Sequence, residues 1–442
     1  MFRGFCPRRR GTIYSGGKVI EKMKKFFGII CVLALVVSVV TGCSCSSKQE
    51  VKTKKAKPAT VDEAKDKNKL IKNEFTLSTD YNYYIGEKDM YSTLTYVKGK
   101  YIYSNKTGIY VKTDIKKDGK KISKNHPRTA WSNGAVLSDG ETVYYLMVKE
   151  GSDSKYEYSV YSVSADGKGE KNILSGVGPA SLITVYKGCL YFRNSPDTSA
   201  EKDTSIMRYK LGSKKDPEMI SLDYQVNYNC VYNGKIYFSN DKFSSPDIVK
   251  DKSIKYDVYS LDLETDDINK AVEYSYGESI AAFDSEDAAF YSRREGEKGK
   301  ICIIDKDGKT TESKKFKAKM DPWFVDKNSE NAVMVDFNKP DHEVFYTYNI
   351  KTAKEYKIGV SPKNFSCEKV TSGLKPAKTP YIVLSSEGKK YYSRISVLKV
   401  NGKKAKFCKI KGKKSVEADT FWISDNKLIT EVNNKMKVYN LK

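Results

Sequence analysis

The sequence has few of the residues from which most catalytic and metal sites are built. Only two histidines, His126 and His342, occur in 442 residues, and neither accompanies a nucleophile motif such as G-x-S-x-G. No Cys-x-x-Cys pair gives support to a zinc-ribbon or thioredoxin-like site. No P-loop or dinucleotide-binding glycine motif occurs. We therefore predict no cofactor, and we favour a binding protein over an enzyme.

Cysteines and Asp-rich turns offer little further chemistry. Five of the nine cysteines are scattered downstream of the N-terminal region, and we expect most of them to be small buried apolar residues. Two Asp-rich stretches, 262–267 and 305–308, lack the D-x-D-x-D-G spacing that directs several oxygens to one calcium ion. Asp-Gly pairs are good turn formers, so we interpret both stretches as turns.

Charge of one sign is in excess. The chain has 79 basic and 55 acidic residues, a formal net charge of +24, which attracts polyanions but also simply keeps a protein soluble. The densest run, 399–414, contains eight lysines and no acid. It predicts either a solvated sheet edge that resists strand addition or a polyanion contact. The candidate contact residues are Lys403, Lys404, Lys406, Lys409 and Lys411.

The N-terminal region has the features of an export signal. Met23-Lys24-Lys25 is followed by an uncharged apolar run, 26–40, which is too short for a typical membrane-spanning helix of about 20 residues. The next residues, Val40-Thr41-Gly42-Cys43, resemble the lipobox of bacterial lipoproteins. The resemblance implies cleavage after Gly42, a covalent diacylglycerol on Cys43 and anchoring to the membrane. An ordinary secretory peptide and an uncleaved anchor are the alternatives.

The chain divides into four parts. Residues 1–22 do not fit an export signal, and we interpret them as an upstream extension, with translation starting at Met23. Residues 23–42 are the signal peptide. Residues 43–69 are rich in Lys, Ser, Thr and Ala, too polar to offset their ordering entropy, so we expect a flexible tether. Residues 70–442 form the folded domain.

That domain is built from two alternating short patterns. The first is a hairpin with apolar flanks and a turn such as Lys-Gly or Asn-Gly, seen clearly at 96–103, 136–144, 185–192 and 231–238. Weaker copies occur at 283–290, 328–333, 385–391 and 423–429. The second is a strand that runs into a turn, at 109–114, 160–167, 206–212, 258–263, 301–308, 345–350, 395–402 and 438–441. The alternation within each copy is typical of strands.

The spacing of these patterns predicts an all-β propeller. Turn glycines at positions 99, 140, 188 and 234 recur every forty to fifty residues, which suits a blade of about four short strands. Eight second-pattern copies indicate eight blades, with seven or six as alternatives. Only three strand candidates follow Ala418, so the last blade lacks one strand. Residues Glu74 to Tyr84 could supply it and close the ring.

The alternation of the segment YNGKIYF with VYSLDL, behind a lipobox, resembles the propeller-type lipoproteins of Firmicutes, whose repeats are related to TolB-like and LDL-receptor-like propellers. The resemblance covers roughly residues 75–442. It implies the fold and a location on the outer face of the bacterial cytoplasmic membrane, and it implies no particular ligand.

Two functions follow as hypotheses. The first is a membrane-anchored binding or scaffolding protein whose partner is an envelope protein, a peptide, a wall polymer or a glycan. We expect it to act as a monomer and not to bind nucleic acid. The second is an extracytoplasmic carbohydrate-active hydrolase or lyase, because a propeller can gather carboxylates from different blades in its channel.

Overall fold

The computed structural model describes residues 93–441, with the exception of 106, 128–134, 151–155, 196–204, 221–225, 241–254, 276–278, 281–288, 296, 306–307, 318, 327–329, 339–341, 376, 389–391 and 434. The chain divides into two compact units, residues 1–59 and 60–442, and all described residues belong to the second. The signal peptide, the tether and the segment Glu74 to Tyr84 lie outside the described residues.

Every described element is a β-strand, and the strands form eight antiparallel sheets in chain order. We call the sheets blades 1 to 8. Blades 1 to 4 comprise β1 (Thr93–Val97), β2 (Lys100–Asn105), β3 (Gly108–Lys112) and β4 (Lys120–Lys121); β5 (Val136–Ser138), β6 (Thr142–Glu150), β7 (Tyr156–Ser164) and β8 (Lys171–Val177); β9 (Ala180–Tyr186), β10 (Cys189–Asn194), β11 (Ser205–Lys210) and β12 (Glu218–Met219); and β13 (Val226–Tyr232), β14 (Lys235–Asn240), β15 (Lys255–Asp262) and β16 (Ile268–Ser275).

Blades 5 to 8 follow the same plan. They comprise β17 (Ser279–Ile280), β18 (Ala289–Glu295), β19 (Lys298–Ile304), β20 (Thr310–Glu312) and β21 (Phe316–Lys317); β22 (Met320–Val325), β23 (Asn331–Asp336), β24 (Val344–Asn349) and β25 (Glu355–Val360); β26 (Ser366–Thr371), β27 (Tyr381–Glu387), β28 (Ser393–Asn401), β29 (Lys404–Phe407) and β30 (Val416–Ala418); and β31 (Thr420–Ser424), β32 (Lys427–Val432) and β33 (Lys435–Asn440).

A tight turn joins the first two strands of most blades. Between β1 and β2, Lys98 and Gly99 have φ angles of 46° and 77°, so both turn residues occupy the left-handed region that two-residue hairpin turns of type I′ require. The same arrangement recurs at Asn233 and Gly234, with φ angles of 47° and 74°. The Xaa-Gly pairs of the first sequence pattern therefore set the register of the inner hairpins.

Both faces of each sheet are apolar, because alternate residues of a strand are buried against different neighbouring blades. In β10, Leu190 and Phe192 pack against blade 2, whereas Tyr191 between them packs against blade 4. Successive side chains of a strand point to opposite sides of the sheet. A blade with two apolar faces must therefore be covered by another blade on each side.

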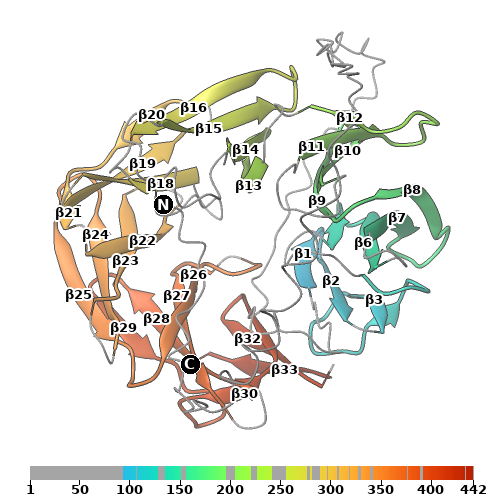
Figure 1. Ribbon diagram of the computed structural model, residues 1–442. Coiled ribbons are helices and arrows are strands. Elements are labelled where there is room, and N and C mark those ends of the chain that lie inside the picture. Colours follow the sequence, from blue (N-terminus) through green and yellow to red (C-terminus); the bar gives the residue numbers. More distant parts are fainter. Residues whose placement is uncertain are drawn as a thin grey trace, which may run out of the picture. The chain divides into compact units, whose positions relative to one another are not determined.

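Contacts between the blades form a closed series. Seven buried apolar clusters join each blade to the next one along the chain. An eighth joins Trp422 and Ile429 of blade 8 to Leu94 and Tyr101 of blade 1. The Tyr101 hydroxyl also lies 3.2 Å from Ser424 Oγ. Within unit 60–442, Figure 1 shows the blades following one another around a ring, with first strands such as β1, β9 and β26 toward its middle.

The structure confirms the eight-bladed all-β propeller, and every second-pattern copy is the third strand of a blade. One first-pattern prediction is wrong. The turn at 385–391 joins the second strand of blade 7 to its third, and the first two strands are instead joined by the longer segment 372–380. The copy at 283–290 lies largely outside the described residues. Blade 8 has three strands in the described part of the chain, as expected.

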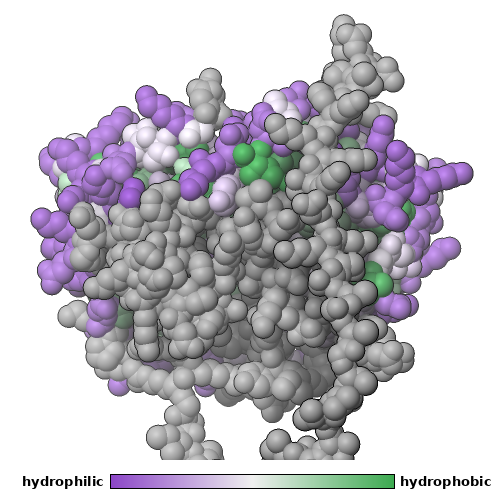
Figure 2. All heavy atoms as spheres, turned by 45° about the horizontal axis from the view of Figure 1, so that its top comes forward, coloured by the Kyte–Doolittle hydropathy of each residue, from purple (hydrophilic) through white to green (hydrophobic). Residues whose placement is uncertain are grey.

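The described surface is mainly hydrophilic. Figure 2 shows hydrophilic residues over most of the described part of one face, with apolar residues in small separate spots. Large exposed apolar side chains among the described residues are limited to Val177, Met219, Phe337 and Phe407. No described segment forms a helix of the length and apolarity needed to span a membrane.

Candidate functional site

The predicted polyanion-contact lysines lie together on the outer part of blade 7. Lys404 and Lys406 belong to β29, the last strand of the main sheet path. Lys403 is in the turn before it, and Lys409 and Lys411 follow in the segment that leads to β30. All five side chains are exposed. We call these five residues the lysine edge.

Buried apolar residues hold the lysine edge in place. Cys408 and Ile410 alternate with its lysines and are 2% and 0% exposed. The Cys408 backbone N–H donates to Val397 O at 2.8 Å, and Ser396 Oγ donates to Lys414 O at 2.9 Å. Because alternate residues of this segment are anchored in the core, the lysines between them are displayed at fixed places on the surface.

Two lysines of this edge lie over aromatic rings of adjoining blades. Lys403 Nζ is 4.3 Å from the ring centroid of Tyr356 in blade 6, and Lys411 Nζ is 5.4 Å from that of Tyr439 in blade 8. A cation over an aromatic face is attracted to it but keeps its charge. Both ammonium groups are thereby positioned without being neutralised.

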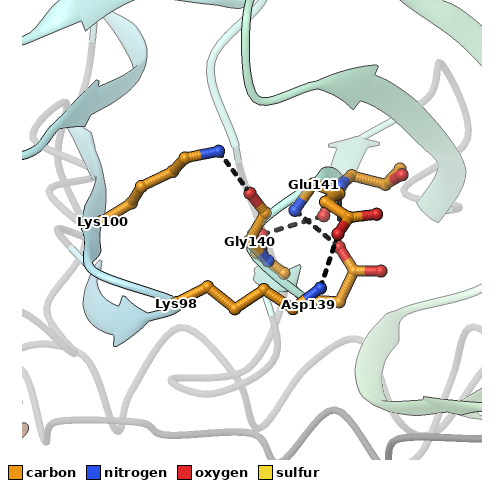
Figure 3. Close-up of polar contacts among 7 residues, drawn as sticks. Lys98, Lys100, Asp139, Gly140 and Glu141 are labelled. Atoms are coloured by element: carbon orange, nitrogen blue, oxygen red, sulfur yellow. Dashed lines mark hydrogen bonds and ion pairs between the residues drawn. The ribbon is translucent and has the colours of Figure 1, made fainter.

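Lysines elsewhere are often used to join blades. Lys98 Nζ in blade 1 pairs with a Glu141 carboxylate oxygen of blade 2 at 2.7 Å, and Lys100 Nζ donates to Gly140 O at 2.8 Å (Figure 3). By contrast, no described carboxylate forms an ion pair with a residue of the lysine edge. Its positive charge is therefore available to a ligand.

A pair of glutamates that the sequence did not single out lies at the junction of blades 6 and 7. Glu343, just before β24, accepts a hydrogen bond from the backbone N–H of Cys367 in β26 at 2.5 Å. Glu368, the next residue of β26, accepts one from Ser385 Oγ. Burial and the nearby Glu368 charge raise the pKa of Glu343 to about 7, and burial also raises the pKa of Glu368.

Glu343 can hold a proton near neutral pH, because its partial burial and the negative charge of Glu368 both raise its pKa. A carboxylic acid with a pKa near 7 suits general acid catalysis. The register shift between Cys367 and Lys369 places Glu368 at a bulge, the kind of irregularity that redirects a side chain. Neither residue stood out in the sequence, because their proximity depends on the packing of two blades.

Other sequence candidates have structural roles. Asp262 Oδ1 accepts the backbone N–H groups of Glu264 and Thr265, and Asp305 Oδ1 accepts that of Lys309, so both Asp-rich stretches are turns. No group of metal-binding side chains occurs among the residues that the structure describes. The five described cysteines are free, and four of them are buried. Burial raises the pKa of the Cys302 thiol to about 11.

Both histidines lie outside strands, with His126 exposed and His342 half-buried next to Glu343. Gly42 and Cys43, the predicted cleavage and lipidation residues, are outside the described residues.

No protein-family model and no curated protein matches the sequence. Among solved structures, the chain is similar to an oligogalacturonate lyase in complex with manganese, at 10% identity and a TM-score of 0.42, over 85% of this chain and 98% of the other. It is also similar to the β-propeller domain of the Trilobed protease from Pyrococcus furiosus, at 15% identity and a TM-score of 0.41. That match covers 68% of this chain and 90% of the other. TolB from Acinetobacter baumannii matches at 9% identity and a TM-score of 0.31. That match covers 78% of this chain and 80% of the other. At this level of similarity the comparisons assign no activity.

The Glu343 pKa predicts a pH dependence of stability. In an unfolded chain glutamate titrates near 4.3, so the folded state binds the proton more tightly. The stability contributed by protonated Glu343 is complete below about pH 4.3 and is lost as pH rises through 7. Relative to Glu343→Gln, the wild-type free energy of unfolding should therefore fall by on the order of 2 kcal/mol between pH 4.5 and 8. Urea unfolding at several pH values measures this difference.

Glu417→Gln, a change at an exposed residue of β30, is the control for loss of a carboxylate. If the difference in free energy of unfolding between wild type and Glu343→Gln does not change with pH, the raised pKa of Glu343 is contradicted.

Proposed function

We propose that the protein is a lipid-anchored binding protein on the outer face of a bacterial cytoplasmic membrane, whose lysine edge binds an anionic polymer of the cell envelope. Cys43 carries the diacylglycerol after cleavage behind Gly42, and residues 43–69 act as the tether. The single observation that supports the binding role is the exposed, positioned and carboxylate-free lysine edge of blade 7.

The chemistry of the lysine edge supports a polymer over a small anion. Five ammonium groups spread along one outer strand and its continuation make many weak contacts instead of converging on one point. Binding of this type gains affinity from the number of charges and from release of counterions, and it weakens as salt rises. The overall excess of positive charge also attracts a polyanion from a distance.

Replacement of the lysine edge tests the binding role. Changing Lys403, Lys404, Lys406, Lys409 and Lys411 together to Gln should weaken binding of polyphosphate at 0.1 M salt by at least about tenfold, because each lysine beside an anionic surface contributes on the order of 1 kcal/mol. The dependence of affinity on salt should also become shallower. Fluorescence anisotropy with a labelled polymer measures both.

The matched control changes five exposed lysines of other blades to Gln: Lys116, Lys117, Lys214, Lys215 and Lys298. It alters the net charge by the same amount and should reduce affinity far less. Equal losses in the two variants would show that net charge, and not the lysine edge, determines binding.

The anchor is tested at Cys43. Wild-type protein expressed in a Gram-positive host should incorporate radiolabelled palmitate and sediment with membranes, whereas Cys43→Ala should do neither, because the thiol that receives the lipid is gone. Cys45→Ala is the control for loss of a nearby cysteine and should behave as wild type. Labelling of Cys43→Ala would overturn the proposal.

A second candidate function is carbohydrate cleavage, which the glutamate pair at blades 6 and 7 favours. In it Glu343 would donate a proton to the leaving oxygen, and Glu368 would act as the partner carboxylate. Wild-type protein should then release reducing ends from a polysaccharide of the envelope, and both Glu343→Gln and Glu368→Gln should lower the rate at least a hundredfold. Unchanged rates in the variants would rule this function out.

A further inference from the structure

Two aromatic side chains that are not fully buried meet at the junction of blades 6 and 7. Trp323 belongs to β22, the first strand of blade 6, and is half-buried. Phe337 is the residue after β23 and is 36% exposed, one of the four large apolar side chains exposed among the described residues. The centroids of the two rings are 5.5 Å apart, and the ring planes are inclined by 44°. We call these two residues the aromatic pair.

The aromatic pair lies on the face of blade 6 that packs on blade 7. Trp323 packs against the apolar cluster shared by these two blades, to which Val333 and Val335 of β23 also belong. Side chains on one face of a strand recur at every second residue, so Phe337 continues the row of Val333 and Val335. The aromatic pair is therefore the continuation of the buried core toward solvent.

A carboxyl group adjoins the aromatic pair. Asp336 and Val344 are the last paired residues of β23 and β24, so Phe337 and Glu343 are the next residues, one on each side of the connection. Residues that face each other on antiparallel strands have Cβ atoms about 5 Å apart. The Glu343 carboxylate is directed to blade 7, where it accepts the backbone N–H of Cys367. Glu343 and Phe337 therefore share one face of the sheet at the same end of the blade.

Buried polar contacts keep Phe337 in place. Asp336, the residue before it, is 1% exposed, and its carboxylate accepts the backbone N–H of Asn338 at 3.1 Å and pairs with Lys319 Nζ at 3.1 Å. Asn338 Nδ2 also donates to Lys319 O at 3.2 Å. The residues on both sides of Phe337 are thus tied to the start of blade 6. An exposed ring that is already positioned loses little entropy when a ligand binds to it.

An aromatic surface beside a carboxyl group matches the two kinds of surface on a sugar. One face of a pyranose ring consists of C–H bonds that pack on an aromatic ring, and its hydroxyl groups form hydrogen bonds with a carboxyl group. Small-molecule sites commonly combine aromatic walls with a few polar groups of this kind. The charge of Glu368 acts on Glu343, so an anionic sugar would bring a third negative charge to this junction, which is unfavourable.

We propose that Trp323, Phe337 and Glu343 form a binding subsite for a neutral pyranose unit of a glycan at the junction of blades 6 and 7. This inference rests on the second candidate function for its site, and it adds the class of sugar and the aromatic residues that contact it. Binding of the sugar does not require its cleavage. The lysine edge, on the outer strand of blade 7, has no part in it.

The experiment uses the full mature chain in a detergent without a sugar headgroup. Neutral tetrasaccharides of glucose, mannose, galactose and N-acetylglucosamine are titrated into the protein in a calorimeter, and we expect at least one of them to bind. Phe337→Ala should weaken that binding about tenfold, because the packing surface of the ring is gone. Phe337→Leu, which keeps an apolar side chain without the flat ring, should lose most of the same affinity.

The matched control is Phe407→Ala, which removes a phenylalanine of nearly equal exposure, 37%, from blade 7. It should change the affinity less than twofold. Tetragalacturonate, which has the same number of sugar units and a carboxylate on each, should bind at least about fivefold more weakly than the neutral tetrasaccharide. Thermal melting of every variant verifies that the fold is retained.

The outcomes separate this inference from the cleavage activity. If a neutral tetrasaccharide binds through Phe337 and no reducing ends are released, cleavage is refuted and the subsite stands. If sugar is cleaved but both Phe337 variants bind as wild type, the subsite is refuted and cleavage stands. Failure of all four neutral tetrasaccharides to bind, or an equal loss in Phe407→Ala, also overturns the subsite. Equal or tighter binding of tetragalacturonate overturns the assignment to a neutral sugar.

Discussion

Each blade of this protein has two apolar faces, and the need to cover both of them governs the rest of the structure. A sheet with one apolar face could be covered by a single partner, but strands such as β10 bury Leu190 and Phe192 on one side and Tyr191 on the other. A linear row of such blades would leave its first and last faces in water. Contact of Trp422 with Leu94 removes both exposed faces at once, which is why the ring must close.

Because ring closure buries both faces of every blade, only the outer strands and the loops remain accessible to a ligand. The interior of each blade is mainly apolar, and most exposed charged residues lie on the rim and near the ends of strands. At the rim of blade 7 the lysines alternate with Cys408 and Ile410, which are anchored in the core. At the junction of blades 6 and 7, the Glu343 side chain accepts a hydrogen bond from the backbone beside Glu368 only because the two blades are packed together. Both candidate sites are thus products of the same packing.

The sequence predicted the third strand of every blade, because a strand followed by a polar turn has a strong period-2 pattern. It failed for the inner hairpin of blade 7, where the long segment 372–380 joins β26 to β27 and the glycine turn lies one connection later. The lysine edge was visible as a dense run. The glutamate pair has no local sequence signal at all.

The most direct test of the account is lysine footprinting. The mature protein would be acetylated with and without bound polyphosphate, and modification would be quantified for each lysine by mass spectrometry. We predict protection of the lysine edge, with Lys116 and Lys214 equally reactive in both samples. Protection spread evenly over the lysines of all blades, or none at blade 7, would contradict a defined binding site on the rim of the propeller.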